Sequence, residues 1–344
     1  MSSDKNFQGY DPNAPGIIGN NIFGLPFNTE NAKVVIIPVP WDVTVSNQSG
    51  TSLGPQNIKT LSYQIDLFDI KDPDAWKQGI AMEPISDITL KKNNEIREKS
   101  SKYISELERG LNPSSNDEMR LILQLVNNEC NALINEVEIK ALKYLDQKKQ
   151  VALIGGDHSI SLGLIKALAK RHNSFGVLQF DAHADLRNAY EGFEHSHASV
   201  MHNALKLEQI SKLVQVGIRD YCEEENSVIE NNSDRIKTFN SRSLYSRLFE
   251  GESWKNICDG IICELPENVY ITFDVDFLNP SECPTTGTPV PGGFSFEHAL
   301  YLVERLVASN KKIVGLDVVE TGPGNLDGIV SCRILYRMIL NMLN

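Results

Sequence analysis

Short apolar runs recur along the chain, and most of the segments between them show helical periodicity. From residue 151 onward the order of apolar run, loop and helical stretch repeats several times, as expected when strands and helices alternate. Strands are predicted at 34–39, 79–84, 151–154, 175–180, 213–216, 235–239, 269–273 and 313–319. Continuous apolar runs between helices indicate a parallel sheet that is covered on both faces, and hence the α/β class.

Helices are predicted where apolar residues recur every three or four positions. The predicted helices are one that starts after Pro55, then 91–110, 117–148, 159–169, 198–205, 241–250, 296–308 and 330–343. The sequence LNPSSN at 111–116 breaks the two longest of these apart. Residues 1–32 are rich in Asn, Gly and Pro, and we expect them to form an irregular arm over the surface, ahead of a single domain at 33–344.

Composition and charge narrow the range of partners. The chain has 344 residues, of which 41% are apolar, so it can bury a sizeable core. Its formal net charge is −12. A strongly acidic body attracts neither nucleic acid nor an anionic membrane, so neither is expected as a partner, whereas a small cationic substrate is compatible with this charge.

The sequence also indicates a cellular compartment. No apolar run approaches the ~18–20 residues that span a bilayer. The first residues are polar and lack the layout of a signal peptide. The six cysteines form no CxxC pair, so we expect free thiols in a reducing cytoplasm, with a redox or nucleophilic cysteine as the alternative.

Polar residues with metal-binding chemistry follow several predicted strands. Asp181, His183 and Asp185 alternate directly after the run 175–180, so in an extended chain their side chains point the same way. The carboxyl ends of parallel strands meet at one edge of a sheet, so other groups that follow strands should lie close to these. Those groups are His158, Asp274, Asp276 and Glu320.

Four aspartates in one place require compensating cations. Their charges repel one another, and two divalent ions would balance the charge of −4. The imidazole and carboxylate ligands include no sulfur, which favours Mn²⁺, with Ni²⁺, Co²⁺, Fe²⁺ or Zn²⁺ as alternatives. Two such ions can lower the pKa of a shared water molecule and turn it into a nucleophile. A single Asp-x-Asp pair also occurs at ordinary strand ends, and it is the combination of motifs that favours a metal site.

Three motifs resemble the signatures of the ureohydrolase family, which comprises arginases, agmatinases, formiminoglutamases and guanidinases. They are GGDHS at 155–159, DAHAD at 181–185 and TFDVD at 272–276. The resemblance runs from about residue 34 to the C-terminus, with a helical insertion relative to the family core near 85–130. It implies an arginase-like three-layer α/β/α fold with a mainly parallel eight-stranded sheet. It also implies two Mn²⁺ ions, hydrolysis of a guanidino compound with release of urea, and a homotrimer or homohexamer.

The resemblance assigns the metal ligands one by one. His158 and Asp185 resemble the ligands of one ion. His183 and Asp276 resemble those of the other. The residues that resemble bridging ligands are Asp181 and Asp274.

The resemblance also assigns residues to the substrate and to proton transfer. Agmatinases place the proton-carrying histidine before a Gly/Ala–Thr/Ser pair, which selects His197, with His195 as the alternative. Glu320 resembles the glutamate that pairs with the substrate guanidinium, and Asp185 also orients the attacking water. The remaining histidines are expected to be structural or exposed, and they are His172, His202 and His298.

Agmatine, which would yield putrescine and urea, is the expected substrate. The stretch TGTPVPGG at 286–293 resembles an agmatinase motif, although Thr285 and Val290 depart from it. Arg187 stands where arginases have the Asn that binds the α-carboxylate of arginine, and Cys222 stands where they have an Asp near its α-amino group. A substrate without the α-carboxylate fits both differences.

Several other activities stay open. The enzyme alternatives are an arginase, a guanidinase and a guanidino-acid hydrolase. An amide hydrolase with a single zinc ion and a non-catalytic binding subunit are more distant alternatives. The complete set of ligands for a second metal argues against the amide hydrolase. The presence of all six predicted ligands, together with His197 and Glu320, argues against the binding subunit.

Overall fold

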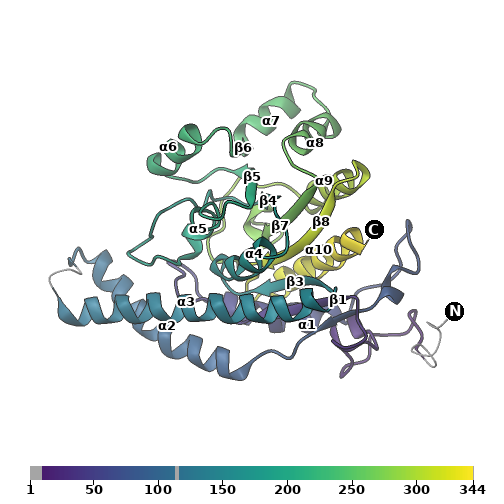
Figure 1. Cartoon of the computed structure of the whole chain (residues 1–344), viewed down its shortest axis with the longest axis horizontal. Helices are drawn as coiled ribbons and strands as arrows, with labels where there is room; N and C mark the ends of the chain where they lie inside the picture. The colour runs from purple at the N-terminus through teal and green to yellow at the C-terminus, as the bar shows by residue number, and fades with distance from the viewer. Residues whose placement is uncertain (1–9, 113–115, 344) are drawn as a thin grey trace.

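A sheet of eight strands forms the centre of the molecule (Figure 1). The computed structural model describes residues 10–112 and 116–343. The strand order is β2-β1-β3-β8-β7-β4-β5-β6, and all neighbouring pairs are parallel in the described part of the chain. The strands are β1 Val34–Val39, β2 Ile80–Met82, β3 Gln150–Gly155, β4 Phe175–Phe180, β5 Ile210–Ile218, β6 Ile236–Asn240, β7 Asn268–Asp274 and β8 Lys312–Val319. The α/β class and each predicted strand are confirmed.

Ten α-helices are present in the described ranges. They are α1 Gly54–Ser62, α2 Asp87–Glu108, α3 Asp117–Asp146, α4 Ser161–Ala169, α5 Val200–Ala204, α6 Glu223–Asn231, α7 Ser241–Phe249, α8 Trp254–Cys263, α9 Phe296–Ala308 and α10 Asn325–Leu343. The sequence patterns missed α6 and α8. Helix α6 is acidic and buries little apolar surface, so it has no hydrophobic periodicity to detect. No helix that the structure describes combines the length and the apolar character that crossing a membrane requires.

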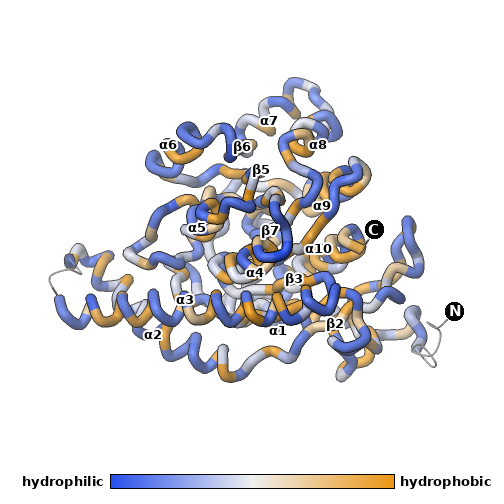
Figure 2. Tube along the Cα trace, in the orientation of Figure 1, coloured by the Kyte–Doolittle hydropathy of each residue, from blue (hydrophilic) through white to orange (hydrophobic). Residues whose placement is uncertain are grey.

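Helices cover both faces of the sheet and create two separate cores. One core packs α1, α8, α9 and α10 against the sheet, and the other packs α2, α3, α4 and α5 against the opposite face. The strands β1 and β4 are buried along their whole length, which explains why they read as unbroken apolar runs. In Figure 2 the tubes of α2 and α3 alternate between hydrophilic and hydrophobic, as expected for helices with one buried side.

Residues 1–9 of the predicted N-terminal arm lie outside the described residues. Residues 10–32 are irregular, as expected, but the prediction that the arm lies over the surface is wrong for part of them. Ile22, Phe23 and Leu25 are at most 2% exposed and belong to the core. Asn21 anchors this segment at the edge of the sheet, because its Oδ1 accepts the backbone N–H of Met82 in β2 at 2.7 Å. These apolar residues stand inside an otherwise polar segment, and that pattern is the sequence signal that could have predicted their burial. That a single domain follows the arm stays a prediction.

The helix pair α2 and α3 occupies most of the region predicted to be an insertion. Helix α2 begins at Asp87, four residues earlier than predicted, because the side chain of Ser86 caps it by accepting the N–H of Thr89. It ends at Glu108, and α3 begins at Asp117. Part of the predicted break, residues 113–115, lies outside the described residues. That this pair is an insertion relative to the family core stays a prediction.

Candidate active site

The predicted ligands converge at the carboxyl edge of the central strands β3, β4 and β7. His158 follows β3, Asp181 follows β4 and Asp274 ends β7, and these strands lie near one another in the sheet. Two residues of the site have backbone angles that side-chain-bearing residues rarely adopt, with φ of 55° at Asp185 and 59° at Glu320. Such conformations cost free energy and are concentrated at functional sites.

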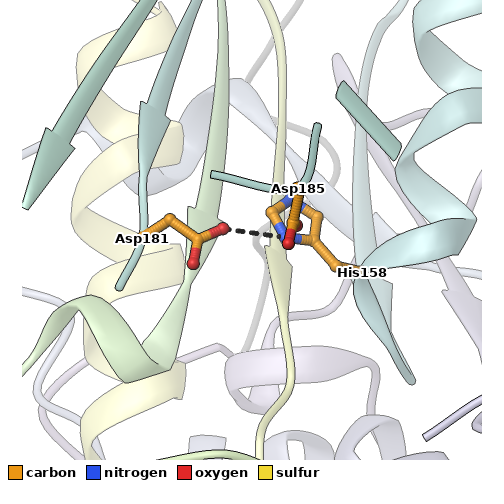
Figure 3. A group of neighbouring side chains, drawn as sticks. All are labelled: His158, Asp181 and Asp185. Atoms are coloured by element: carbon orange, nitrogen blue, oxygen red, sulfur yellow. Dashed lines mark ion pairs between the residues drawn. The ribbon is translucent and has the colours of Figure 1, made fainter. Parts of the chain in front are cut away.

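His158 lies at the centre of the first ligand group (Figure 3). Its Nδ1 is 2.9 Å from Oδ2 of Asp185 and 3.1 Å from Oδ2 of Asp181. Oδ2 of Asp274 lies 3.5 Å from the same nitrogen. The imidazole is fully buried, and its Nδ1 makes no hydrogen bond of acceptable geometry with any residue that the structure describes.

The other nitrogen of His158 settles its tautomer. Nε2 lies 2.7 Å from the hydroxyl of Thr272, and that hydroxyl donates its proton to Oδ1 of Asp317 at 2.8 Å. The hydroxyl therefore accepts from Nε2–H, and Nδ1 is the nitrogen that faces the carboxylates. Burial lowers the pKa of this imidazole, but the carboxylates of Asp181 and Asp185 raise it well above its usual value, so a cation, either a proton or a metal ion, is favoured at Nδ1. Fixing a ligand histidine through its second nitrogen is a general feature of metal sites.

Sequence reasoning gave no role to Thr272 or Asp317. Asp317 is a charged residue inside the buried strand β8, and that was the signal that could have found it. Burial raises the pKa of its carboxyl group, and hydrogen bonds from Thr272 and Tyr270 oppose the increase.

The second ligand group shares Asp181 with the first. Nδ1 of His183 is 3.0 Å from Oδ2 of Asp276 and 3.6 Å from Oδ1 of Asp181. In each group the ligand atoms all lie within 4.8 Å of one another. Backbone N–H groups hold the carboxylates in place, since Ala182 donates to Asp276 at 2.9 Å and His183 donates to Asp181 at 2.7 Å.

The crowding of carboxylates perturbs their protonation. Burial and the charge of Asp181 raise the pKa of Asp185 to about 7. Burial, followed by the charges of Asp276 and Asp181, raises the pKa of Asp274 well above its usual value. Such a site is stabilised when cations replace protons. The donor chemistry fits two divalent ions, while the roles of the six residues as ligands stay predictions.

A small polar cleft opens beside the ligands. It encloses about 180 Å³ and is lined by Ser46, His183, Asp185, Arg187, Tyr190, His197, Ala198, Asp220, Tyr221, Glu225 and Thr288. Two predicted metal ligands and the predicted proton carrier therefore face the same space. Larger hollows on the surface are lined by none of the predicted ligands.

His197 lies in the wall of this cleft, at the start of the 3₁₀ turn His197–Ser199. Its backbone N–H donates to Oγ1 of Thr44 at 3.2 Å, and the ring of Tyr190 meets its imidazole edge-on at 6.1 Å. Burial, and then the imidazoles of His183 and His158, lower the pKa of His197 to about 3. His195 does not line the cleft, so the structure separates the two alternatives, and the role of His197 stays a prediction.

Glu320 follows β8 and lies against the first ligand group, but it is not among the residues that line the cleft. Its Oε1 accepts the backbone N–H of His158 at 3.0 Å, whereas its Oε2 is buried and has no hydrogen-bond partner in the described chain. Its backbone is fixed by bonds to Gly156 and Thr286. Burial, followed by the charge of Asp274, raises the pKa of this carboxyl group well above its usual value.

Arg187 is held in the cleft by two neighbours. Its guanidinium lies 4.7 Å over the ring of Tyr190, and its Nε is 3.6 Å from Oε2 of Glu225. Glu225 is buried and accepts the backbone N–H groups of Leu186 and Cys222 at 3.0 and 2.9 Å. Sequence reasoning missed Glu225, which is hidden in a run of three glutamates. Cys222 is the N-cap residue of α6.

Comparison with known proteins covers nearly the whole chain. Residues 32–342 match the Arginase family. The N(1)-aminopropylagmatine ureohydrolase of Thermus thermophilus is 31% identical over 297 residues, which is 86% of this chain and 84% of that protein. The agmatinase of Shigella sonnei is 28% identical over 333 residues, covering 94% of this chain and 93% of that protein.

A solved structure shows the same fold. The arginase of Bacillus subtilis superimposes with a TM-score of 0.64 at 21% identity, covering 89% of this chain and 98% of that one. A carboxylate and imidazole cluster at the carboxyl edge of such a sheet has the ligand chemistry of a metal site. The chain belongs to the arginase family, whose members depend on a binuclear metal centre and hydrolyse C–N bonds of amidines. The predicted arginase-like three-layer α/β/α fold is confirmed.

Proposed function

We propose that this enzyme hydrolyses agmatine to putrescine and urea. The observation that carries the proposal is the buried Oε2 of Glu320, which has no partner in the described chain and lies beside the metal ligands. A buried carboxylate oxygen without a donor is costly, and a guanidinium group supplies planar N–H donors with a positive charge.

The six ligands would hold two Mn²⁺ ions, with Ni²⁺ or Co²⁺ as the alternatives. Oxygen and imidazole donors without thiolate suit this group of metals. When bound, the metal pair would supply a water molecule of lowered pKa as the nucleophile.

The side chains of the site have separate roles in the reaction. Glu320 binds the guanidinium, and Asp185 orients the attacking water. The water oxygen adds to the guanidinium carbon, the C–N bond to the alkyl amine breaks, and urea remains. With its low pKa His197 is a neutral imidazole, so it takes a proton from the attacking water and passes it to the amine as the amine leaves.

The charged residues that line the cleft favour a cationic substrate tail. Asp220 and Glu225 contribute two negative charges there, and Arg187 contributes one positive charge that is already engaged by Glu225. The ammonium group of agmatine fits this balance better than the carboxylate of arginine or of a guanidino acid.

N(1)-aminopropylagmatine is the second candidate substrate. The relative with 31% identity bears the name of that activity. Its longer tail carries additional positive charge, and the acidic wall suits this tail for the same reason. The two candidates therefore differ in tail length rather than in the chemistry at the metal site.

Urea release tests these proposals directly. The purified protein is incubated with agmatine, N(1)-aminopropylagmatine, arginine, guanidine and guanidinobutyrate, each with Mn²⁺ and with Ni²⁺. We expect agmatine to give the highest kcat/KM. Fast turnover of arginine alone would contradict the proposal. One bound zinc per chain, without urea from any compound, would indicate an amide hydrolase, and no metal at all would indicate a binding subunit.

We also propose a homotrimer or homohexamer in the cytoplasm. The resemblance to ureohydrolases supports the assembly, and the free cysteines in the described ranges are compatible with a reducing compartment. Neither nucleic acid nor a membrane is expected as a partner, because the net charge is −12. Light scattering of the metal-loaded protein measures the assembly.

A further inference from the structure

The helices α2 and α3 contact two loops that line the cleft. Figure 1 shows the two helices next to each other along one side of the molecule. One of the loops, residues 42–46, carries Ser46, and the other, residues 190–197, carries Tyr190 and His197. The mechanism proposed above gives neither helix a role.

Helix α2 holds the first loop through its backbone. Arg97 donates from Nη1 to the carbonyl oxygens of Val43, at 3.1 Å, and Val45. Asn93 is fully buried and binds Asp42 twice, accepting the backbone N–H at 2.7 Å and donating to Oδ1 at 2.9 Å. These bonds tie the backbone of Asp42, Val43 and Val45 to one helix and so restrict the movement of the loop.

Helix α3 holds the second loop in a similar way. Oδ1 of Asn127 accepts the backbone N–H of Glu194 at 3.0 Å, and its Nδ2 donates to the carbonyl of Gly192 at 3.3 Å. The ring of Tyr103 from α2 packs against Phe193 with the centroids 5.3 Å apart. The residues just before the turn of His197 are therefore fixed from both helices.

The two supports meet at His197. Oγ1 of Thr44 accepts the backbone N–H of His197 and donates to Oδ2 of Asp157, both at 3.2 Å. Thr44 thus links His197 to Asp157, the residue that precedes His158. We propose that α2 and α3 form a brace that sets the position of His197 in the cleft, with Asn127 as a positioning residue. This proposal rests on the proposed function, in which His197 protonates the leaving amine.

Substitution of Asn127 tests the brace. Asn127→Ala removes both bonds to the loop, and we expect kcat to fall about 10- to 100-fold, since small misplacements of a catalytic group are this costly. KM and metal content should not change. Asn127→Asp keeps the acceptor for Glu194 and should restore part of the rate. The matched control is Asn135→Ala on the same helix, which loses a bond of 2.9 Å to Lys166, away from the cleft, and should leave kcat unchanged.

Hydrogen exchange supplies a readout that needs no turnover. Asn127→Ala should speed amide exchange in 190–197, and Asn135→Ala should not. Unchanged exchange in this segment would overturn the brace, and faster exchange with an unchanged kcat would overturn the positioning role. Equal loss of kcat in both variants would also overturn it, because the effect would then be general destabilisation. If the wild-type protein released no urea from any guanidino compound, the proposed function would fail, while exchange would still decide whether α3 holds the loop.

Discussion

Glu320 accepts a hydrogen bond from the backbone N–H of His158 at 3.0 Å, so the predicted guanidinium-binding group is joined directly to a predicted metal ligand. This bond holds Oε1 and leaves Oε2 without a hydrogen-bond partner in the described chain. Because the group is ordered before a substrate arrives, binding does not bear the entropy cost of ordering it. The predicted metal site and the proposed substrate site are therefore linked through Glu320.

Replacing Glu320 by Gln should reduce kcat/KM strongly. The variant keeps the shape of the side chain and removes its charge, and a hydrogen bond to a charged group contributes about 2–3 kcal/mol, or about 30- to 150-fold in rate. Bound metal should stay the same. Glu282→Gln is the control, because its Oε2 accepts the N–H of Phe296 at the start of α9. Equal kcat/KM in the two variants would contradict the role of Glu320.

Replacing Thr272 by Val should weaken metal binding. The variant keeps the volume and removes the hydroxyl that links His158 to Asp317, and loss of such a partner lowers metal affinity about 10- to 100-fold. Titration of the apoprotein with Mn²⁺ against a competing chelator measures this change. Thr238→Val in β6 is the matched control, because it loses only a bond of 2.7 Å to Gln215. An unchanged affinity in Thr272→Val would show that the hydroxyl does not orient the imidazole.

Replacing His197 by Asn should slow the chemical step. Loss of a general acid costs about 10²–10⁴-fold in kcat, and metal content should be unaffected because no predicted metal ligand is changed. His195→Asn, outside the cleft, should retain nearly full kcat under the same conditions. The reverse result, a slow His195 variant and a fast His197 variant, would move the proton-carrying role to His195.

Replacing Glu191 by Gln should stabilise the protein at alkaline pH. Burial, followed by the charge of Glu108, raises the pKa of Glu191 from its ordinary 4.5 to about 7, so the folded state holds a proton that the unfolded state has released. The contribution of Glu191 to the free energy of unfolding of the wild-type protein is therefore greatest below pH 4.5. It decreases as the pH rises to 7. Because the side chain is only partly buried, we expect Glu191→Gln to raise the free energy of unfolding by about 1 kcal/mol at pH 8.

Thermal unfolding at two pH values measures that difference. The gain of Glu191→Gln should be present at pH 8 and absent at pH 4, where both states of the wild-type protein are protonated. The exposed Glu194→Gln serves as the control and should show no gain at either pH. A gain that is the same at both pH values would indicate a packing effect rather than a titration.

The sheet and the ligand cluster could be predicted because both leave local marks in the sequence. A strand buried on both faces, such as β4, is largely apolar, and candidate ligands such as Asp181 and His183 are recognised by their alternation. The convergence of these ligands followed from the rule that parallel strands place their ends at one edge.

The remaining features depend on contacts between distant segments. Asp317 is a charged residue in an apolar strand, and the sequence alone does not explain it. The structure explains it, because the hydroxyl of Thr272 links Asp317 to His158. In the sequence Glu225 does not differ from the other glutamates of an acidic helix. Only the structure shows that it accepts the backbone N–H of Leu186. The support that Asn127 gives to the cleft has no sequence signal, because an asparagine on a helix is ordinarily solvated.

The bond between Asn21 and Met82 has a consequence for the state of the protein in solution. Edge strands expose unpaired backbone groups that can recruit another chain and start aggregation. At β2 the amide side chain of Asn21 takes the place of a neighbouring strand, since it accepts the N–H of Met82 at 2.7 Å and donates to its carbonyl at 3.3 Å. The strand is also only three residues long. The arm thereby closes this side of the sheet to further strand addition.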